Sequence, residues 1–141
     1  MRTGLGVDDL GDLLDQPLIA VLATRRADES IMLSPVWFEW HDGGINVWVP
    51  TIEGGKVGHI QRDPRATIVV ANTTWPYKGF ELRGEATVST EPDDFYAVLH
   101  RTGVRYSGQE TADRMVAEYA PGAVIRLVPG TIRAWDYEDE A

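Results

Sequence analysis

The residues best suited to hold a ligand lie in three short segments rich in glycine, proline and aromatic side chains. The first is the loop Gly54-Gly55-Lys56. Two glycines let a backbone approach a ligand closely, and the helix predicted to follow presents unpaired N–H groups and a partial positive charge. With the charge of Lys56 beside them, these groups form a candidate phosphate-binding site. Gly-Gly-Lys is also common in ordinary turns, where the lysine lies on the surface.

The second segment, Ser34-Pro35-Val36-Trp37, places a proline inside a predicted strand. Proline removes one donor from the strand ladder, which predicts an edge strand or a bulge and leaves backbone groups free for a flat, hydrogen-bonding ring. Trp37 adds apolar contact for such a ring. The alternative is a bulged edge strand whose aromatic side chains belong to the core.

The third segment is Trp75-Pro76-Tyr77-Lys78-Gly79. Two large aromatic side chains in a loop are costly to leave in water unless they cover something. We expect them to cover a ligand, a partner subunit or the end of a barrel.

Other kinds of chemistry lack the residues they need. The chain has no cysteine, which excludes thiolate metal sites, disulfides and a cysteine nucleophile. It also has no GxSxG, HExxH or Walker motif. His41, His59 and His100 do not share metal-ligand spacing, so no metal site is predicted. No residue stands out as a catalytic acid, so an enzymatic reaction would depend on a bound cofactor.

Composition and charge describe one folded domain over residues 1–141, with 43% hydrophobic and 25% charged residues. The formal net charge of -9 disfavours nucleic acid as a partner. No apolar run approaches the roughly 18 residues of a membrane span, and no signal-peptide pattern opens the chain. We therefore expect a cytoplasmic protein that binds neither nucleic acid nor membranes.

The hydrophobic patterns predict mostly strands. The first part of the chain is expected to form a helix over 6–16, an antiparallel meander of strands over 18–25, 31–40 and 45–49, and a short helix over 57–62. Strands over 66–71, 79–89, 123–128 and 131–137 follow, with helices over about 91–100 and 111–119. Six or seven strands with two or three short helices favour a mainly β (α+β) fold, a small antiparallel barrel.

Taken together, the three segments resemble the pyridoxamine 5′-phosphate oxidase-like family of flavin and deazaflavin proteins, whose fold is an antiparallel split β-barrel. The resemblance covers residues 18–88 and rests on PVWF at 35–38, K-x-x-x-I-x-R-D-P-R at 56–65 and Y-K-G-x-x-x-x-G-x-A at 77–86. Within this family the chain most resembles the actinobacterial branch that uses the deazaflavin coenzyme F420.

The resemblance implies a homodimer with two cofactor sites at the subunit interface. It places Lys56 at the cofactor phosphate, where Gly54 and Gly55 replace the hydroxyl residue and arginine usual in the family. It places Ser34, Pro35, Val36 and Trp37 beside the ring, and Pro50 and Thr51 along the phosphate side. Trp75, Tyr77, Lys78 and Gly79 would reach the site from the partner subunit.

The implied activity is that of an oxidoreductase. Reduced F420 would deliver a hydride to a C=C or C=N bond of a small unsaturated substrate, with Tyr77, Lys78 or solvent as the proton source. An FMN-dependent protein is the first alternative, and a non-catalytic carrier of flavin or haem is the second. F420 carries an acidic tail that FMN lacks, and the clustered cations available to such a tail are Arg25, Arg26, Arg62 and Arg65.

Overall fold

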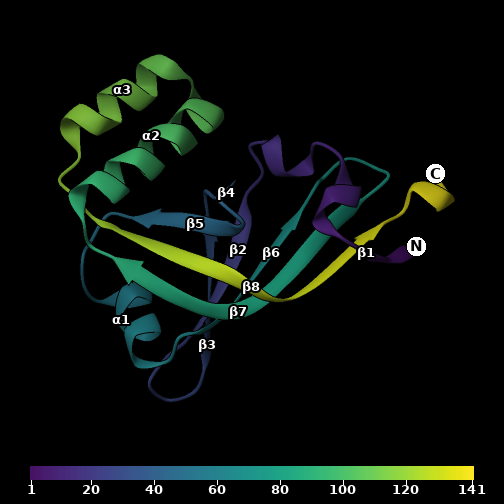
Figure 1. Ribbon diagram of the computed structural model, residues 1–141, viewed down its shortest axis with the longest axis horizontal. Coiled ribbons are helices and arrows are strands. Elements are labelled where there is room, and N and C mark those ends of the chain that lie inside the picture. The colour runs from purple at the N-terminus through teal and green to yellow at the C-terminus, as the bar shows by residue number, and fades with distance from the viewer.

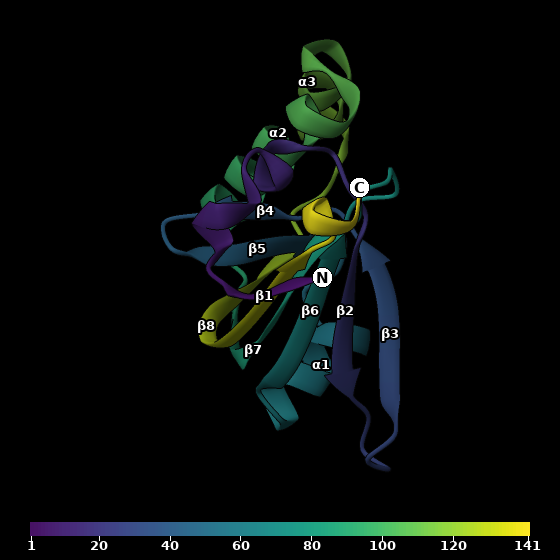
Figure 2. The ribbon, with the colours of Figure 1, turned by 90° about the vertical axis from the view of Figure 1, so that its right-hand side faces the viewer.

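A single antiparallel sheet forms the framework of the protein in a computed structural model that describes residues 1–141. Its strands are β1 (Arg2–Leu5), β2 (Ala20–Arg25), β3 (Ile31–Val36), β4 (Glu39–His41), β5 (Gly44–Val49), β6 (Arg65–Ala71), β7 (Lys78–Ser89) and β8 (Ala123–Asp136). Their order is β3-β2-β6-β7-β8-β5-β4, with β1 paired to β8. The sheet curls into a half-barrel (Figure 1), in which β5 runs across the direction of β2 and β3 (Figure 2). The predicted mainly β fold is confirmed.

The sheet has eight strands, one more than the upper end of the predicted range, and the reasons are local. The two strands predicted at the C-terminal end form one continuous strand, β8. The pairing of β8 with β7 shifts register opposite Arg83 and Gly84, where β8 contains one extra residue. Such a β-bulge tolerates a proline, here Pro129. The predicted strand over 31–40 divides into β3 and β4, and β1 adds a short strand that was not predicted.

The predicted meander is wrong beyond its hairpins. β2 pairs with β3 and β4 pairs with β5, but β3 and β4 lie at opposite edges of the sheet. The chain leaves the ladder at Trp37 and Phe38, where the Phe38 N–H donates to the Tyr106 hydroxyl at 3.2 Å. The barrel is therefore split between β3 and β4. Pro35 lies on the edge strand β3, as its missing N–H predicts.

Three α-helices accompany the sheet: α1 (Gly55–Arg62), α2 (Pro92–Ser107) and α3 (Gln109–Glu118). α2 and α3 form a hairpin at one end of the half-barrel (Figure 1). The helix predicted over 6–16 is wrong. That segment forms two 3-10 turns, Val7–Leu10 and Leu13–Asp15, because Gly11 adopts a φ of 65° between them. A third 3-10 turn spans Glu138–Glu140. None of the helices has the length and apolar character that crossing a membrane requires.

Two apolar cores hold these elements together. The larger core fills the half-barrel and includes the inward row of β7, where Phe80, Leu82 and Ala86 are buried as their alternation predicts. The smaller core joins α2, α3 and β8, and Trp37 and Trp48 pack against it. These two tryptophans therefore connect the split in the barrel to the helical hairpin.

Candidate functional site

A pocket of about 460 Å³ opens where the barrel is split, and we call it the β3–β5 pocket. It falls within the range of small-molecule sites, and most of its lining is apolar, as is usual for such sites. The pocket brings together five residues predicted to bind a cofactor, Pro35, Val36, Trp37, Pro50 and Lys56. Its remaining lining residues are Ile19, Trp48, Val49, Met115 and Tyr119.

Strand alternation separates the predicted ring-binding residues. Ser34 is 7% exposed and faces the core, whereas its neighbours Leu33 and Pro35 are exposed on the other face of β3. Ser34 does not line the β3–β5 pocket. Thr51 is an exposed loop residue that follows the lining residue Pro50.

Trp37 is held as a flat platform by the residue stacked on it. Its ring lies parallel to that of Tyr106, with centroids 4.6 Å apart and planes 6° from parallel. The Tyr106 hydroxyl accepts from the Phe38 N–H and donates to the Leu18 carbonyl, which fixes this ring in turn. Burial raises the pKa of Tyr106 above 10.0, so the phenol keeps the proton it donates. Tyr106 of α2 therefore positions Trp37 in the wall of the pocket, although Tyr106 itself does not line the pocket.

Trp48 extends the aromatic wall. Its ring meets Trp37 edge-on at 6.2 Å and Tyr119 at 5.9 Å. Such edge-to-face pairs are favourable because the edge of one ring is electropositive and the face of the other electronegative. The indole Nε1 of Trp48 is buried and has no hydrogen-bond partner within the chain. Sequence reasoning missed Trp48, Met115 and Tyr119, because only folding brings β5 and α3 beside β3.

The start of α1 supplies the pocket's positive charge. Gly54 and Gly55 have φ values of 76° and 47°, which side-chain-bearing residues rarely adopt, so glycine is required for this turn. The N-cap Gly54 offers no side chain to the first N–H groups of the helix. Lys56 forms no ion pair and is the only charged residue lining the β3–β5 pocket. A helix start without a side-chain cap, beside a lysine that forms no ion pair, is suited to an anion.

The loop predicted to reach the site lies elsewhere on this chain. Trp75 and Lys78 line a separate pocket of about 380 Å³ together with Leu18. Gly79 has a packing reason to be glycine, since a Cβ there would lie 2.5 Å from the Val70 carbonyl oxygen. Trp75 and Tyr77 are both about half exposed. Their proposed contribution to a partner's site thus stays a prediction.

The outer face of the sheet combines an apolar half with a charged half. Residues opposite one another on β3, β2, β6 and β7 form rows across this face, one of which runs Leu33, Ala23, Thr67 and Arg83. Leu33 is 66% exposed, and Ile19 and Ile31 are also exposed. Exposed apolar residues gathered on one face mark an interaction surface.

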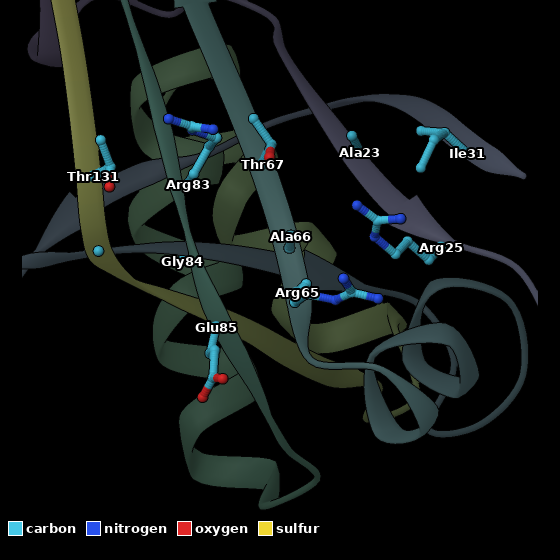
Figure 3. Close-up of a pocket in the computed structure, with 11 residues that line it drawn as sticks. Ala23, Arg25, Ile31, Arg65, Ala66, Thr67, Arg83, Gly84, Glu85 and Thr131 are labelled. Atoms are coloured by element: carbon cyan, nitrogen blue, oxygen red, sulfur yellow. The ribbon is translucent and has the colours of Figure 1, made fainter. Parts of the chain in front are cut away.

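A second pocket, of about 480 Å³, lies at the charged side of this face, and we call it the arginine pocket. Figure 3 shows Arg25 of β2 and Arg65 of β6 directed toward the space between their strands, while Arg83 of β7 lies beyond Thr67 and is directed away from them. Arg65 pairs with Asp63 at 2.7 Å and lowers the pKa of that carboxyl to about 2. Arg83 approaches Glu81 at 3.7 Å, whereas Arg25 forms no ion pair.

Of the four arginines predicted to bind an acidic cofactor tail, only two line the same pocket. Arg25 and Arg65 line the arginine pocket, whereas Arg26 and Arg62 do not. Arg62 instead donates to the Arg25 carbonyl at 2.5 Å and joins α1 to β2. Arg83 was missed, although its outward position follows from the alternation of β7.

A family model described as "Pyridoxamine 5′-phosphate oxidase" matches residues 8–136. A conserved hypothetical protein from Mycobacterium tuberculosis superposes with a TM-score of 0.79 at 22% identity, covering 96% of this chain and 88% of that one. A structure titled F420 reductase gives 0.66 at 23% identity, with coverages of 86% and 93%. The haem-storage protein HutZ from Vibrio cholerae gives 0.69 at 15% identity, with coverages of 89% and 92%. These likenesses establish a shared fold. No match was found among curated proteins.

Proposed function

Because the chain belongs to the pyridoxamine 5′-phosphate oxidase family, we propose that it is an oxidoreductase that uses coenzyme F420 on a small unsaturated substrate. The observation that carries this proposal is the β3–β5 pocket, which combines a flat aromatic platform with one free lysine at a helix start. We further propose a cytoplasmic homodimer, with the cofactor sites at its interface.

The pocket fits the two parts of such a cofactor. Trp37 and Trp48 offer apolar surface to a planar ring, and the edge strand β3 leaves backbone groups free beside it. Lys56 and the first N–H groups of α1 fit a phosphate. F420 carries its phosphate as a singly charged diester, whereas FMN carries a dianion. One lysine without hydroxyl or arginine neighbours matches the diester better, which favours F420.

When bound, the reduced deazaflavin would supply a hydride to an electron-poor double bond. The residues of this chain orient the reactants and exclude water. Trp37, held by Tyr106, fixes the plane against which a ring packs. The apolar lining keeps water from the reacting carbons. We assign the proton to solvent or to the partner's Tyr77 or Lys78, because these residues lie outside the β3–β5 pocket of their own chain.

The outer face supports the proposed homodimer. The exposed apolar residues of this face extend to the β3–β5 pocket, because Pro35 and Ile19 also line that pocket. Its charged half contains Glu81 and Glu85 together with Arg25, Arg65 and Arg83. A two-fold axis can place such a mixed surface against its own copy, with opposite charges facing each other. A second chain in this position would complete the rim of the pocket.

The test is a titration of the purified protein with F420 and with FMN, followed by fluorescence. Lys56→Ala is expected to weaken F420 binding tenfold or more, because a buried charge-assisted contact contributes about 1.5–3 kcal/mol. Arg114→Ala, which removes an exposed cation of α3 outside the β3–β5 pocket, is the control for loss of one positive charge. Unchanged affinity in Lys56→Ala would remove Lys56 from the site, and tighter binding of FMN than of F420 would favour the FMN alternative. Tight binding without turnover of any unsaturated acceptor would favour a carrier.

A further inference from the structure

The C-terminal half of α2 holds the segment at which the barrel is split. Three consecutive residues of this segment each contact a different residue of α2: Trp37, Phe38 and Glu39. The first stacks on Tyr106, and the carbonyl of the second accepts a hydrogen bond from the Arg105 guanidinium. The carboxylate of the third accepts two hydrogen bonds from Arg101, both at 2.8 Å. These contacts fix the path on which the chain leaves the strand ladder.

Arg105 connects this segment to the N-terminal part of the chain. Its Nη2 donates to the Phe38 carbonyl, and its Nη1 donates to the Leu14 carbonyl at 3.3 Å. Leu14 belongs to the second 3-10 turn, and the purple N-terminal turns lie beside α2 in Figure 2. The guanidinium also lies over the rings of Phe38 and Tyr106, 5.0 and 5.1 Å from their centroids. Bonding two carbonyls while covering two rings requires the planar fork of arginine, which lysine lacks.

Arg105 is a half-buried cation without an acidic partner. It forms no ion pair, whereas Arg101, one turn earlier in α2, pairs with the buried carboxylate of Glu39. The Nε atom of Arg105 is buried and has no hydrogen-bond partner within the chain. Desolvating a charge and a donor in this way is costly, and an apolar side chain of similar volume often stabilises as well as a buried charge does. The role that remains for the guanidinium is to fix the position of the groups it bonds.

The groups held by this end of α2 adjoin the lining of the β3–β5 pocket. Trp37 lines the pocket and precedes the residue whose carbonyl Arg105 bonds. Ile19 also lines the pocket, and it follows Leu18, whose carbonyl accepts from the Tyr106 hydroxyl. Neither Arg105 nor Tyr106 lines the pocket itself. Any effect of these two residues on a ligand therefore passes through the lining residues beside them.

We infer that Arg105 is a positioning residue, which fixes the plane of Trp37 for the cofactor ring without contacting the cofactor. This inference rests on the proposed function, because Trp37 is the surface on which the ring would pack. It also separates the roles of two cations. Arg105 acts on the ring wall, so its loss should weaken ligands with and without a phosphate by the same factor. Lys56 lies at the proposed phosphate site, so its loss should weaken only the phosphate-bearing ligand.

The experiment measures the binding of two ligands by fluorescence: F420, and the same deazaflavin ring with its ribityl chain but without phosphate or tail. Arg105→Met removes the fork and keeps an apolar stem, and it is expected to weaken both ligands equally, about five- to tenfold. Lys56→Ala should weaken F420 alone. Arg126→Met is the matched control, because Arg126 also donates to two carbonyls, those of His41 and Asp42, but lies outside the pocket. It should bind both ligands as the wild type does.

A second measurement requires no cofactor. Labelling with 5-fluorotryptophan gives each of the five tryptophans a fluorine resonance, and Trp37→Phe identifies the one from Trp37. Arg105→Met is expected to move the Trp37 resonance beyond its wild-type linewidth and to leave that of Trp135, in β8, unchanged. Arg126→Met should leave both resonances unchanged. The spectra are recorded where circular dichroism shows each variant to be folded, so that a loss of stability alone does not move them.

Two results would overturn the inference: an unchanged Trp37 resonance in Arg105→Met, or unequal losses of affinity for the two ligands. Arg105→Lys keeps the charge but not the fork, and it replaces Arg105→Met in both assays if that variant does not fold. Failure of both variants to fold would also overturn the inference, since Arg105 would then be required for folding itself. Failure of the proposed function has a different signature, because the wild type would then bind neither ligand while the Trp37 resonance still responded to Arg105.

Discussion

The two pockets at the ends of β3 are similar in volume and opposite in chemistry. Pro35 borders the apolar β3–β5 pocket, and Ile31 borders the arginine pocket. Pro35 follows Ile31 by four positions along the strand, which corresponds to about 13 Å. One pocket holds flat apolar surface with a single lysine, whereas the other is lined by three arginines and Glu85. One edge of the sheet thus carries an apolar pocket and an arginine-lined pocket close enough together for one elongated ligand to contact both.

α1 connects the two pockets. Lys56 lies at its start and lines the β3–β5 pocket, while Arg62 at its end bonds the carbonyl of Arg25. A ligand with a ring, a phosphate and an acidic tail would match this sequence of surfaces from one pocket to the other. FMN would occupy the first pocket alone. F420 would therefore need both pockets, whereas FMN would need only the β3–β5 pocket.

Removing the aromatic platform of the β3–β5 pocket should have the largest effect on stability and on binding. Trp37→Ala is expected to lower the free energy of unfolding by about 2–3 kcal/mol, because a large, half-buried aromatic side chain is lost. It should also abolish measurable ring binding. Denaturant unfolding and fluorescence titration measure the two effects.

Trp75→Ala is the matched control for that change, since Trp75 is 49% exposed and lies in another pocket. Its stability should change by less than about 1 kcal/mol. Weaker cofactor binding in this variant would support a contribution from the partner subunit. A Trp37→Ala protein that binds the ring normally would contradict the assignment of the β3–β5 pocket.

The next largest effect should come from charging the apolar half of the outer face. Leu33→Glu is expected to raise the dimer dissociation constant at least about thirtyfold, since a central apolar contact is typically worth 2 kcal/mol or more. Sedimentation velocity measures this change. Ile52→Glu, which charges an exposed isoleucine in the loop before α1, should leave the dimer intact. A wild-type protein that sediments as a monomer would contradict the proposed interface.

The sequence predicted the fold better than it predicted the complete site. Short-range features were readable: the missing N–H of Pro35 placed β3 at an edge, and Gly54-Gly55-Lys56 marked the start of α1. What sequence could not supply was the departure of the chain from the ladder at Trp37. That departure depends on a hydrogen bond between the Phe38 N–H and Tyr106, which are 68 residues apart.

The same limit explains the missed site residues. Met115 and Tyr119 read as ordinary positions on an amphipathic helix, and only tertiary packing brings them to the pocket. Arg83 could have been found, because β7 alternates regularly and leaves this side chain on the outer face. The helix predicted over 6–16 had the right buried face, but Gly11 interrupts it.

Neutralising the arginine pocket should have a moderate effect that is specific to the longer cofactor. Arg25→Gln is expected to weaken F420 binding about three- to tenfold and to reduce its salt dependence, because a partly exposed charge contributes modestly. FMN binding should not change. Arg133→Gln, outside this pocket, is the control. An equal loss of affinity for F420 and FMN would show that the arginine pocket does not bind the acidic tail.

The smallest expected effect is a pH dependence that separates two titratable groups at the C-terminal end of α1, His59 and Asp63. Burial lowers the pKa of His59 below 6.5, helped by the nearby charges of Arg62, Arg26 and Lys56. Its Nδ1 lies 3.0 Å from the Thr24 hydroxyl. Since the unfolded chain takes up this proton more readily than the folded chain, stability should fall as pH decreases through about 6.5. Asp63, whose pKa is lowered to about 2 by Arg65, stays ionised over this range. Its contribution is lost only as the pH falls from about 4 toward 2.

The measurement is the thermal midpoint between pH 7.5 and pH 5. His59→Gln should flatten the curve, because glutamine does not titrate. Asp63→Asn should shift the curve without changing its slope in this interval. A wild-type midpoint that is constant between pH 7.5 and pH 5, or a slope that survives in His59→Gln, would show that His59 is not the titrating group. An altered slope in Asp63→Asn would show that His59 and Asp63 are electrostatically coupled at this end of α1, and His59 could then not be treated as an independent titrating group.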